Sequence, residues 1–287
     1  MRARVKKGAA AVAVALSVVA AAVVGGGQSS VAQPSGLRAF GITADGTLMA
    51  TFTTNKPQEL NWVRAIGGFS GDTAAIGLDF RVQDGLLYLV GNKGGVYTVK
   101  TPPQVDDVTV TKVSQLTVPL YGTNFGVDFN PALDRLRIIS DTGQNLRHNL
   151  GDNTTTEDAV LSTPPALGPT RGVTAAAYTN NDLNPDTATT LFDIGTATDE
   201  LLIQSPANNG LLTAVGKLTV DAGANAGFDI YSTLSNGKAV TSTGFATLVA
   251  PNGTASLYSV NLLNGTAASL GQFPLAVTDL AITLTGS

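Results

Sequence analysis

Short runs in which apolar and polar residues alternate recur along most of the chain and predict strands rather than helices. The runs are rich in β-branched residues, and turn signals such as Asn236-Gly237 separate them, a pattern typical of hairpins. A short motif returns within these runs: a small residue, an apolar one, a polar one and an apolar one. The steps between copies are about 50 residues, close to the period of propeller repeats. The copies begin at Gly77, Gly126, Gly172, Gly227 and Val277.

The two ends of the chain predict how the repeats close. After the last copy only one strand fits, at 280–284, whereas three unassigned strands lie near the start, at 37–42, 47–53 and 61–66. One C-terminal strand and three N-terminal strands would complete a fifth sheet and leave no long open edge. We therefore expect an all-β fold, a five-bladed β-propeller. The chief competitors are a β-sandwich and an open stack of repeats.

The N-terminus predicts export. A basic cluster precedes an apolar run at 9–24, and small residues then lead to Ala32, which together form the pattern of a secretory signal peptide. We place the cut after Ala32, so that 1–32 is the signal peptide and 33–287 is a single propeller domain. The alternative is an uncleaved membrane anchor, since about 20 apolar residues can span a bilayer.

Composition narrows the classes of partner and chemistry. Charged residues make up 13% of the 287 residues and hydrophobic ones 43%, which suits a turn-rich β fold and excludes a disordered chain. Removing residues 1–32 takes away four cations and no anions, so the net charge of −4 becomes −8. An acidic protein repels phosphate backbones, so we expect no nucleic acid and, after signal cleavage, no membrane as a partner. With no Cys, thiol catalysis, thiolate metal sites and disulfides are excluded.

One long motif carries a family resemblance. The stretch FGVDFNPALDRLRIISDTGQNLRHN at 125–149, with GVTAAAYTN at 172–180 and shorter matches at 191–194 and 226–230, resembles the bacterial family called "domain of unknown function 4394". The resemblance covers nearly all of the chain after the signal peptide. It implies an exported, propeller-like protein with no assigned activity, and it brings no catalytic residues. One departure is His148, where we expect an apolar residue.

The polar position of the repeat is the first candidate site. The innermost strands of a propeller place equivalent residues around the central axis. Several carboxylates there would repel one another in surroundings poor in water, unless a cation lies among them or each accepts hydrogen bonds. The functional hypothesis is an axial cation or ligand site, and the structural alternative is that each Asp binds nearby backbone N–H groups. The residues at this position are Asp79, Asp128, Thr174, Asp229 and Asp279.

A second candidate is a calcium loop. Asp182, Asn184 and Asp186 offer oxygen ligands at alternate positions, and Asp193 stands where a twelve-residue calcium loop has its last ligand. Thr187 occupies the place of the usual turn glycine, and a plain polar hairpin is the alternative. Calcium is the one cofactor that the sequence suggests.

Three further features favour structural roles. The Asp-Thr-Gly triplet at 141–143 matches aspartic proteases, but that chemistry needs two such carboxylates, so a β-turn is the better interpretation. His148, the single histidine, alternates with leucines and is expected to be packed between blades. Arg135, Arg137 and Arg147 cluster in the second repeat and form either inter-blade ion pairs or an anion-binding patch.

These observations support an exported, monomeric scaffold that binds an extracellular ligand or protein without catalysis. The alternative is a glycoside hydrolase that uses two axial Asp residues as acid and base. Enzymatic activity is left open, with the lack of a catalytic constellation counting against it. The scarcity of aromatic residues, 6% with one Trp, also counts against a deep sugar cleft.

Overall fold

The described residues form an all-β protein. A computed structural model describes residues 36–100, 107–166 and 168–287. The predicted signal peptide and its cleavage site lie outside these residues. Their one helical element is a short 3-10 turn, η1 (Ala207–Asn209). Nowhere in this part of the chain is there a helix with the length and hydropathy that a membrane span requires.

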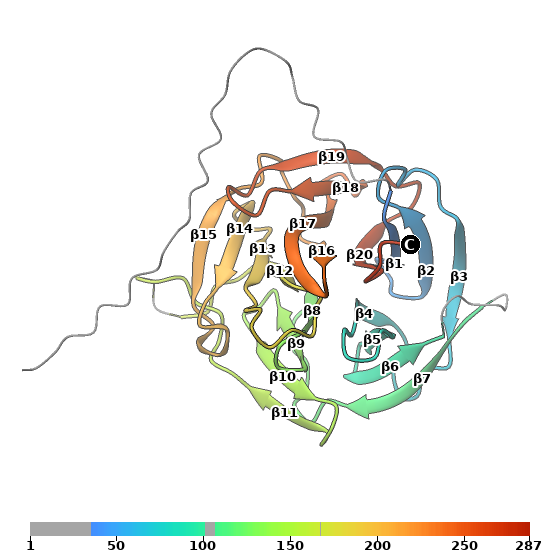
Figure 1. Ribbon diagram of the computed structural model, residues 1–287, viewed down its shortest axis with the longest axis horizontal. Helices are drawn as coiled ribbons and strands as arrows, with labels where there is room; N and C mark the ends of the chain where they lie inside the picture. Colours follow the sequence, from blue (N-terminus) through green and yellow to red (C-terminus); the bar gives the residue numbers. More distant parts are fainter. Residues whose placement is uncertain (1–35, 101–106, 167) are drawn as a thin grey trace, which may run out of the picture. The chain divides into compact units, whose positions relative to one another are not determined.

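Three antiparallel sheets contain four strands each (Figure 1). Their orders are β11-β10-β9-β8, β12-β13-β14-β15 and β16-β17-β18-β19, so consecutive strands always pair. The strands are β8 (Phe125–Asn130), β9 (Arg135–Ser140), β10 (Asn145–Asn149), β11 (Thr154–Glu157), β12 (Val173–Tyr178), β13 (Leu191–Gly195), β14 (Glu200–Gln204), β15 (Leu212–Lys217), β16 (Ala226–Ser235), β17 (Lys238–Val249), β18 (Ala255–Val260) and β19 (Ala267–Gln272).

The remaining strands form an eight-stranded sheet in the order β20-β1-β2-β3-β7-β6-β5-β4. It consists of two four-stranded units joined by a short parallel contact between β3 and β7, with two residue pairs. The C-terminal strand β20 pairs with β1, as the sequence predicted. The strands are β1 (Arg38–Thr43), β2 (Leu48–Thr53), β3 (Trp62–Gly67), β4 (Ala75–Phe80), β5 (Leu87–Gly91), β6 (Gly95–Val99), β7 (Val108–Gln115) and β20 (Val277–Ile282).

The first strand of each four-stranded unit lies nearest a common centre (Figure 1). These inner strands touch one another in sequence, β4 with β8, β8 with β12, β12 with β16, β16 with β20, and β20 with β4. The contact between β20 and β4 links the end of the chain to its first repeat. Residues at the same level of these strands therefore converge on the centre.

The core lies between the faces of neighbouring sheets. Phe129 of β8 packs edge-on against Tyr88 of β5, with ring centroids 5.1 Å apart, and Phe40 of β1 packs in the same way against Phe80 of β4. Every residue of β5 is buried, because this strand has a neighbouring sheet on each side. Burying a side chain such as Leu89 stabilises the fold by roughly 2 kcal/mol. With no Cys in the chain, apolar clusters of this kind hold the sheets together.

Candidate functional site

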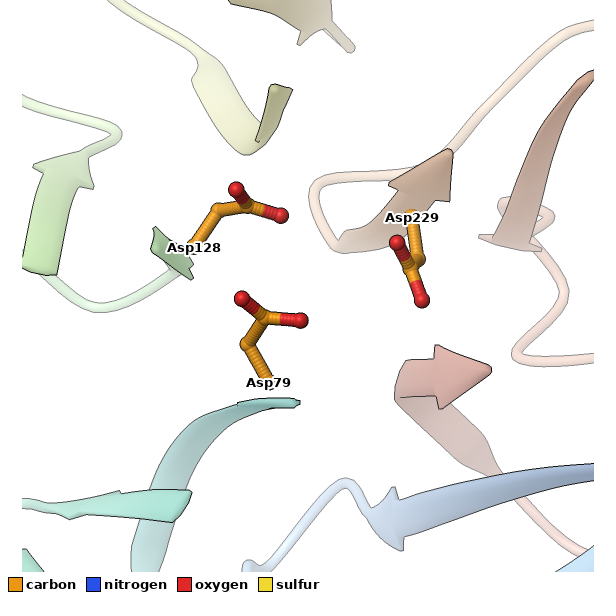
Figure 2. A group of neighbouring side chains, drawn as sticks. All are labelled: Asp79, Asp128 and Asp229. Carbon is orange, nitrogen blue, oxygen red and sulfur yellow. The ribbon is translucent and has the colours of Figure 1, made fainter. Parts of the chain in front are cut away.

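Three acidic side chains converge at the centre of the sheets. Asp79 of β4, Asp128 of β8 and Asp229 of β16 each offer a carboxylate oxygen, and these oxygens lie within 4.8 Å of one another. Figure 2 shows the three carboxyl groups pointing toward one another from three separate strands. All three residues are buried. Among the described residues this is the one group of three or more acidic, His or Cys side chains with metal-site spacing.

Each of these carboxyls also connects its own strand to the next inner strand. One oxygen of each accepts a hydrogen bond from a backbone N–H of that strand, which satisfies a buried donor. The structural alternative drawn from the sequence expected contacts of this kind. The donors are the amides of Phe129 for Asp79 (2.8 Å), Tyr178 for Asp128 (3.1 Å) and Ile282 for Asp229 (2.5 Å).

The same contacts identify which residues stand at this level in β12 and β20. Asp79 binds the amide that follows Asp128. By the same geometry, the amides of Tyr178 and Ile282 follow the equivalent residues, which are Ala177 and Ala281. The axial level therefore holds three Asp and two Ala residues. The repeat motif had aligned Thr174 and Asp279 with the three Asp residues.

In β12 the repeat motif was aligned three residues before the axial level, at Thr174 instead of Ala177. The register between β12 and β13 shifts between Val173 and Ala175, at Thr174. In β4 the corresponding shift falls at Ile76, three residues before its axial Asp, just as Thr174 comes three residues before Ala177. Thr174 is fully buried and its Oγ1 donates to Oγ1 of Thr196 at 3.4 Å. It has no part in the carboxyl group at the centre.

Asp279 lies one level away, two residues before Ala281. Its Oδ2 accepts a hydrogen bond from the amide of Leu78 at 3.2 Å. Glycines make room for its side chain: a Cβ added to Gly227 would lie 2.5 Å from Asp279 Oδ1, and one added to Gly77 would lie 3.2 Å from Oδ2. Asp279 also lines a polar cavity of about 220 Å³ at the N-terminal ends of β4 and β8. This cavity gives the carboxyl level of Asp279 access to solvent.

Burial and mutual repulsion disfavour ionisation of these acids. Burial raises the pKa of Asp229 to about 6, against hydrogen bonds from the amides of Ile282 and Ile230 that lower it. The pKa of Asp79 and that of Asp128 are raised well above the usual range, first by burial and then by the charges of the neighbouring carboxyls. Burial raises the pKa of Asp279 in the same direction. The group at the centre therefore favours either bound protons or a bound cation.

The three axial carboxyls fit a hard cation in part. Carboxylate oxygens are the ligands that Ca²⁺ prefers, and it takes about six to eight of them. Both oxygens of Asp79 already accept hydrogen bonds, from Phe80 and Phe129. A cation here would therefore need water or other oxygen atoms to complete its coordination.

The residues of the predicted calcium loop do not converge. Asp182 accepts hydrogen bonds from the amides of Asn184 and Ala239, and the Asn184 side chain accepts one from the amide of Asp186, as in turns. Asp193 lies in the middle of β13 and is fully buried. Asp182, Asp186 and Asp193 form no group with metal-site spacing in the described part of the chain. The geometry here is that of a polar turn followed by a strand.

Asp193 is itself an anomaly that the calcium-loop pattern did not anticipate. Both of its oxygens are buried and have no hydrogen-bond partner. Burial raises its pKa well above the usual range, and the nearby charge of Arg137 lowers it. Asp193 pairs with Ala176 and Leu202, so it faces an apolar layer. The alternating pattern of β13 predicts that the side chain of residue 193 points inward. The sequence does not show that this side chain lacks a hydrogen-bond donor beside it.

Two other motifs have structural roles. His148 is fully buried, with Nε2 2.6 Å from Ser114 Oγ and Nδ1 2.9 Å from Thr155 Oγ1, and burial lowers its pKa. This matches the packed histidine that the sequence predicted. Asp141 accepts a hydrogen bond from the amide of Thr123 at 2.9 Å, beside the turn that joins β9 to β10. These contacts favour the turn over a protease triplet.

Comparison with protein families gives one match. The family model described as "Domain of unknown function (DUF4394)" matches residues 48–281, which include all three axial Asp residues. No curated protein matches the chain. The family description carries no activity.

Several solved structures are similar to this chain at low identity. One is a structural genomics protein of unknown function from Bacteroides thetaiotaomicron, with a TM-score of 0.44, 11% identity, and coverage of 88% of this chain and 68% of that one. The Myxococcus xanthus glutaminyl cyclase has a TM-score of 0.41, 10% identity, and coverage of 83% and 92%. The WD40 domain of Toxoplasma gondii coronin has a TM-score of 0.39, 14% identity, and coverage of 79% and 55%. Likenesses at these scores carry no inference about activity.

Proposed function

This chain belongs to the family described as "Domain of unknown function (DUF4394)", and from its site we propose an exported, non-catalytic scaffold whose axial carboxyls hold a cation. The ring around that cation has five blades and presents its faces to an extracellular ligand or protein. Calcium is the cation we propose, because the available ligands are carboxylate oxygens. Export rests on the signal-peptide pattern of residues 1–32.

The contacts of the inner strands support the five-bladed ring. They run from β4 through β8, β12, β16 and β20 and return to β4. Each inner strand begins a unit of four strands, since the eight-stranded sheet divides at the short β3–β7 contact. The hydrogen bonds of Asp79, Asp128, Asp229 and Asp279 all run from one inner strand to the next. These four acids therefore link successive inner strands, which favours closure of the ring.

The convergence of three buried carboxyls is the observation that carries the proposal. Buried charges are expensive unless they are paired or bind a metal. No basic side chain is among the causes of the pKa shifts of Asp79, Asp128 or Asp229. A cation at the centre would offset their repulsion and hold three inner strands at once. It would therefore stabilise the folded ring near neutral pH. At that pH, bound protons alone stabilise the ring only weakly.

The alternative of a glycoside hydrolase receives less support. The axial oxygens lie within 4.8 Å of one another. This spacing is well below the roughly 6.5–9.5 Å of inverting glycosidases and slightly below the roughly 5–5.5 Å of retaining ones. Each axial carboxyl is bound to a backbone amide, and the cavity that Asp279 lines is about 220 Å³, which is small for a sugar site. The arrangement suits a small ion better than a glycan.

Thermal unfolding tests this proposal. The protein lacking residues 1–32 is melted near neutral pH with a chelator and then with increasing calcium. A ligand that binds only the folded state raises the melting temperature with concentration, so we expect a calcium-dependent rise. Asp128→Asn removes one axial charge and keeps an oxygen that can accept from Tyr178. We expect this variant to melt higher than the parent in chelator and to lose most of the calcium response.

Asp193→Asn is the matched control, because Asp193 is also a buried acid but lies away from the axial group. It should keep the full calcium response. In one outcome, calcium leaves the melting temperature of the parent protein unchanged while the Asp128→Asn variant still melts higher than the parent. In that case the axial acids bind protons only. An equal calcium response in the parent and Asp128→Asn would place the cation elsewhere. Either result contradicts the proposed site.

A further inference from the structure

A second concave site lies between the β8–β11 sheet and the β12–β15 sheet. It is a cavity of about 290 Å³, which we call the arginine pocket. Three of the 17 Lys and Arg residues of this acidic chain line it. Tyr178 from the end of β12 and the η1 turn close the opposite side. The lining includes Arg135, Arg137, Arg147, Asn208 and Asn209.

Arg137 forms the fixed base of the arginine pocket. Its side chain is 2% exposed. Its guanidinium donates to Asp158 and Asn145 within its own sheet, and to Asn208 and Tyr178 across the boundary between the sheets. A planar guanidinium held in this way has little freedom left to lose when a ligand binds.

The other two arginines keep donors available. Arg147 binds Asp158 through Nε and Nη2, and its Nη1 makes no hydrogen bond with the other described residues. Arg135 donates through Nη1 to the carbonyl oxygens of Leu133 and Asp134, which leaves its Nε and Nη2. Two acceptors of the pocket, Asn208 Oδ1 and Tyr178 Oη, already accept from Arg137. The pocket therefore offers more donors than acceptors.

Nearby carboxyls balance the charge of the arginine pocket, but in the described part of the chain only one of them takes up its hydrogen-bond donors. Asp158 is the carboxylate that binds both Arg137 and Arg147, and Asp193 lies within electrostatic range of Arg137 from the apolar side. Asp152 lies within electrostatic range of Arg135, so three guanidinium groups face three carboxyls. Of these, Asp158 is the one that forms hydrogen bonds with the pocket arginines among the described residues. Guanidinium groups recognise carboxylate and phosphate groups through paired hydrogen bonds.

We propose that the arginine pocket binds the carboxylate or phosphate group of a small molecule. Arg135 and Arg147 supply the hydrogen bonds to the oxyanion, and Arg137 supplies a fixed positive charge at the base of the pocket. Leu133, Pro206 and Ala207 give a small apolar wall to the rest of the ligand. This site is independent of the axial acids, which lie on the inner strands, and it needs no cation.

Titration calorimetry at constant ionic strength tests the site, with inorganic phosphate and citrate as separate probes and chloride as the background anion. We expect saturable binding of at least one probe, and the tighter probe indicates whether a phosphate ester or an organic acid is the better ligand. The double substitution Arg135→Gln and Arg147→Gln should weaken that binding about tenfold or more, because charge-assisted hydrogen bonds are lost. Arg171→Gln, at an exposed arginine outside the pocket, is the matched control and should bind normally.

A second variant keeps the test independent of the Arg147–Asp158 pair. Asn209 is exposed, so Asn209→Asp should fold, and its carboxylate would occupy the arginine pocket in place of the ligand. We expect this variant to lose anion binding. Without added anion, its melting temperature should be higher than that of the parent protein. Failure of both probes to bind the parent protein would overturn the proposal. Binding that survives both the double substitution and Asn209→Asp would also overturn it.

Discussion

The inner strands fall into two kinds that differ at one level. In β4, β8 and β16 that level holds an Asp, which binds an amide of the next strand. In β12 and β20 it holds Ala177 and Ala281, which are fully buried. β12 contacts β16 with no Asp at this level, whereas β20 is linked to β4 by Asp279 at the neighbouring level. An Asp at the axial level is therefore not required to pair neighbouring inner strands. The three carboxyls are therefore better explained by what they do together at the centre.

The largest expected effect comes from making β12 resemble β8. Ala177→Asp would add a fourth carboxyl at the axial level. We expect the free energy of unfolding near neutral pH to fall by about 3–5 kcal/mol, the range for an uncompensated buried charge. Chemical denaturation measures this loss, and Ala177→Asn controls for the added volume. If both variants lose equal stability, the effect is steric and charge at the axis is unimportant.

The pH dependence of stability should show the charge of the axial group. The folded pKa of Asp229 is raised to about 6, above its unfolded value, so the folded state binds more protons than the unfolded state between these two values. Stability from this group is full below about pH 4 and falls as pH rises through about 6, by on the order of 3 kcal/mol. The difference in unfolding free energy between the parent and Asp229→Asn, measured in chelator across this window, isolates the effect. A difference that does not change with pH would contradict the raised pKa.

Two substitutions at Asp128 separate its hydrogen bond from its charge. At about pH 4, where the carboxyl is protonated, Asp128→Ala leaves the amide of Tyr178 without its acceptor, and we expect a loss of about 1–3 kcal/mol. Asp128→Asn keeps an acceptor and should be nearly neutral under the same conditions. Denaturation midpoints of the two variants give the comparison. Equal losses would show that the contact with Tyr178 contributes little.

The smallest effect is expected at Asp193, the buried acid without a hydrogen-bond partner. Asp193→Asn removes a charge that burial disfavours, and no donor is orphaned by the change. The nearby Arg137 loses a favourable charge, so the two effects partly cancel. We expect a gain of about 1 kcal/mol near neutral pH, seen as a higher melting temperature. A clear loss of stability would show that Asp193 and Arg137 act as an ion pair.

The sequence predicted the sheets better than their register. Short apolar runs bounded by turn signals predicted the inner strands, because a strand packed on both sides is apolar on both faces, and alternating runs predicted the half-buried strands. The pairing of β20 with β1 could be predicted, because the last repeat has only one strand and the N-terminal segment has three strands that belong to no other repeat. The axial residue of β12 could not be predicted, because Ala177 stands where β4, β8 and β16 have Asp. The polar residue that marks this level is missing there, so the motif was aligned at Thr174 instead. Contacts such as that of Arg137 with Tyr178 depend on how neighbouring sheets approach, which spacing along the chain does not encode.

Proton release on calcium addition tests the central claim most directly, because a cation that binds protonated carboxyls must displace their protons. Calorimetry at about pH 6, repeated in buffers of different ionisation enthalpy, counts the protons released per calcium bound. We predict proton release with the parent protein and with Asp193→Asn, and little or none with Asp128→Asn. Calcium binding without proton release, or no binding at all, would contradict an axial cation site.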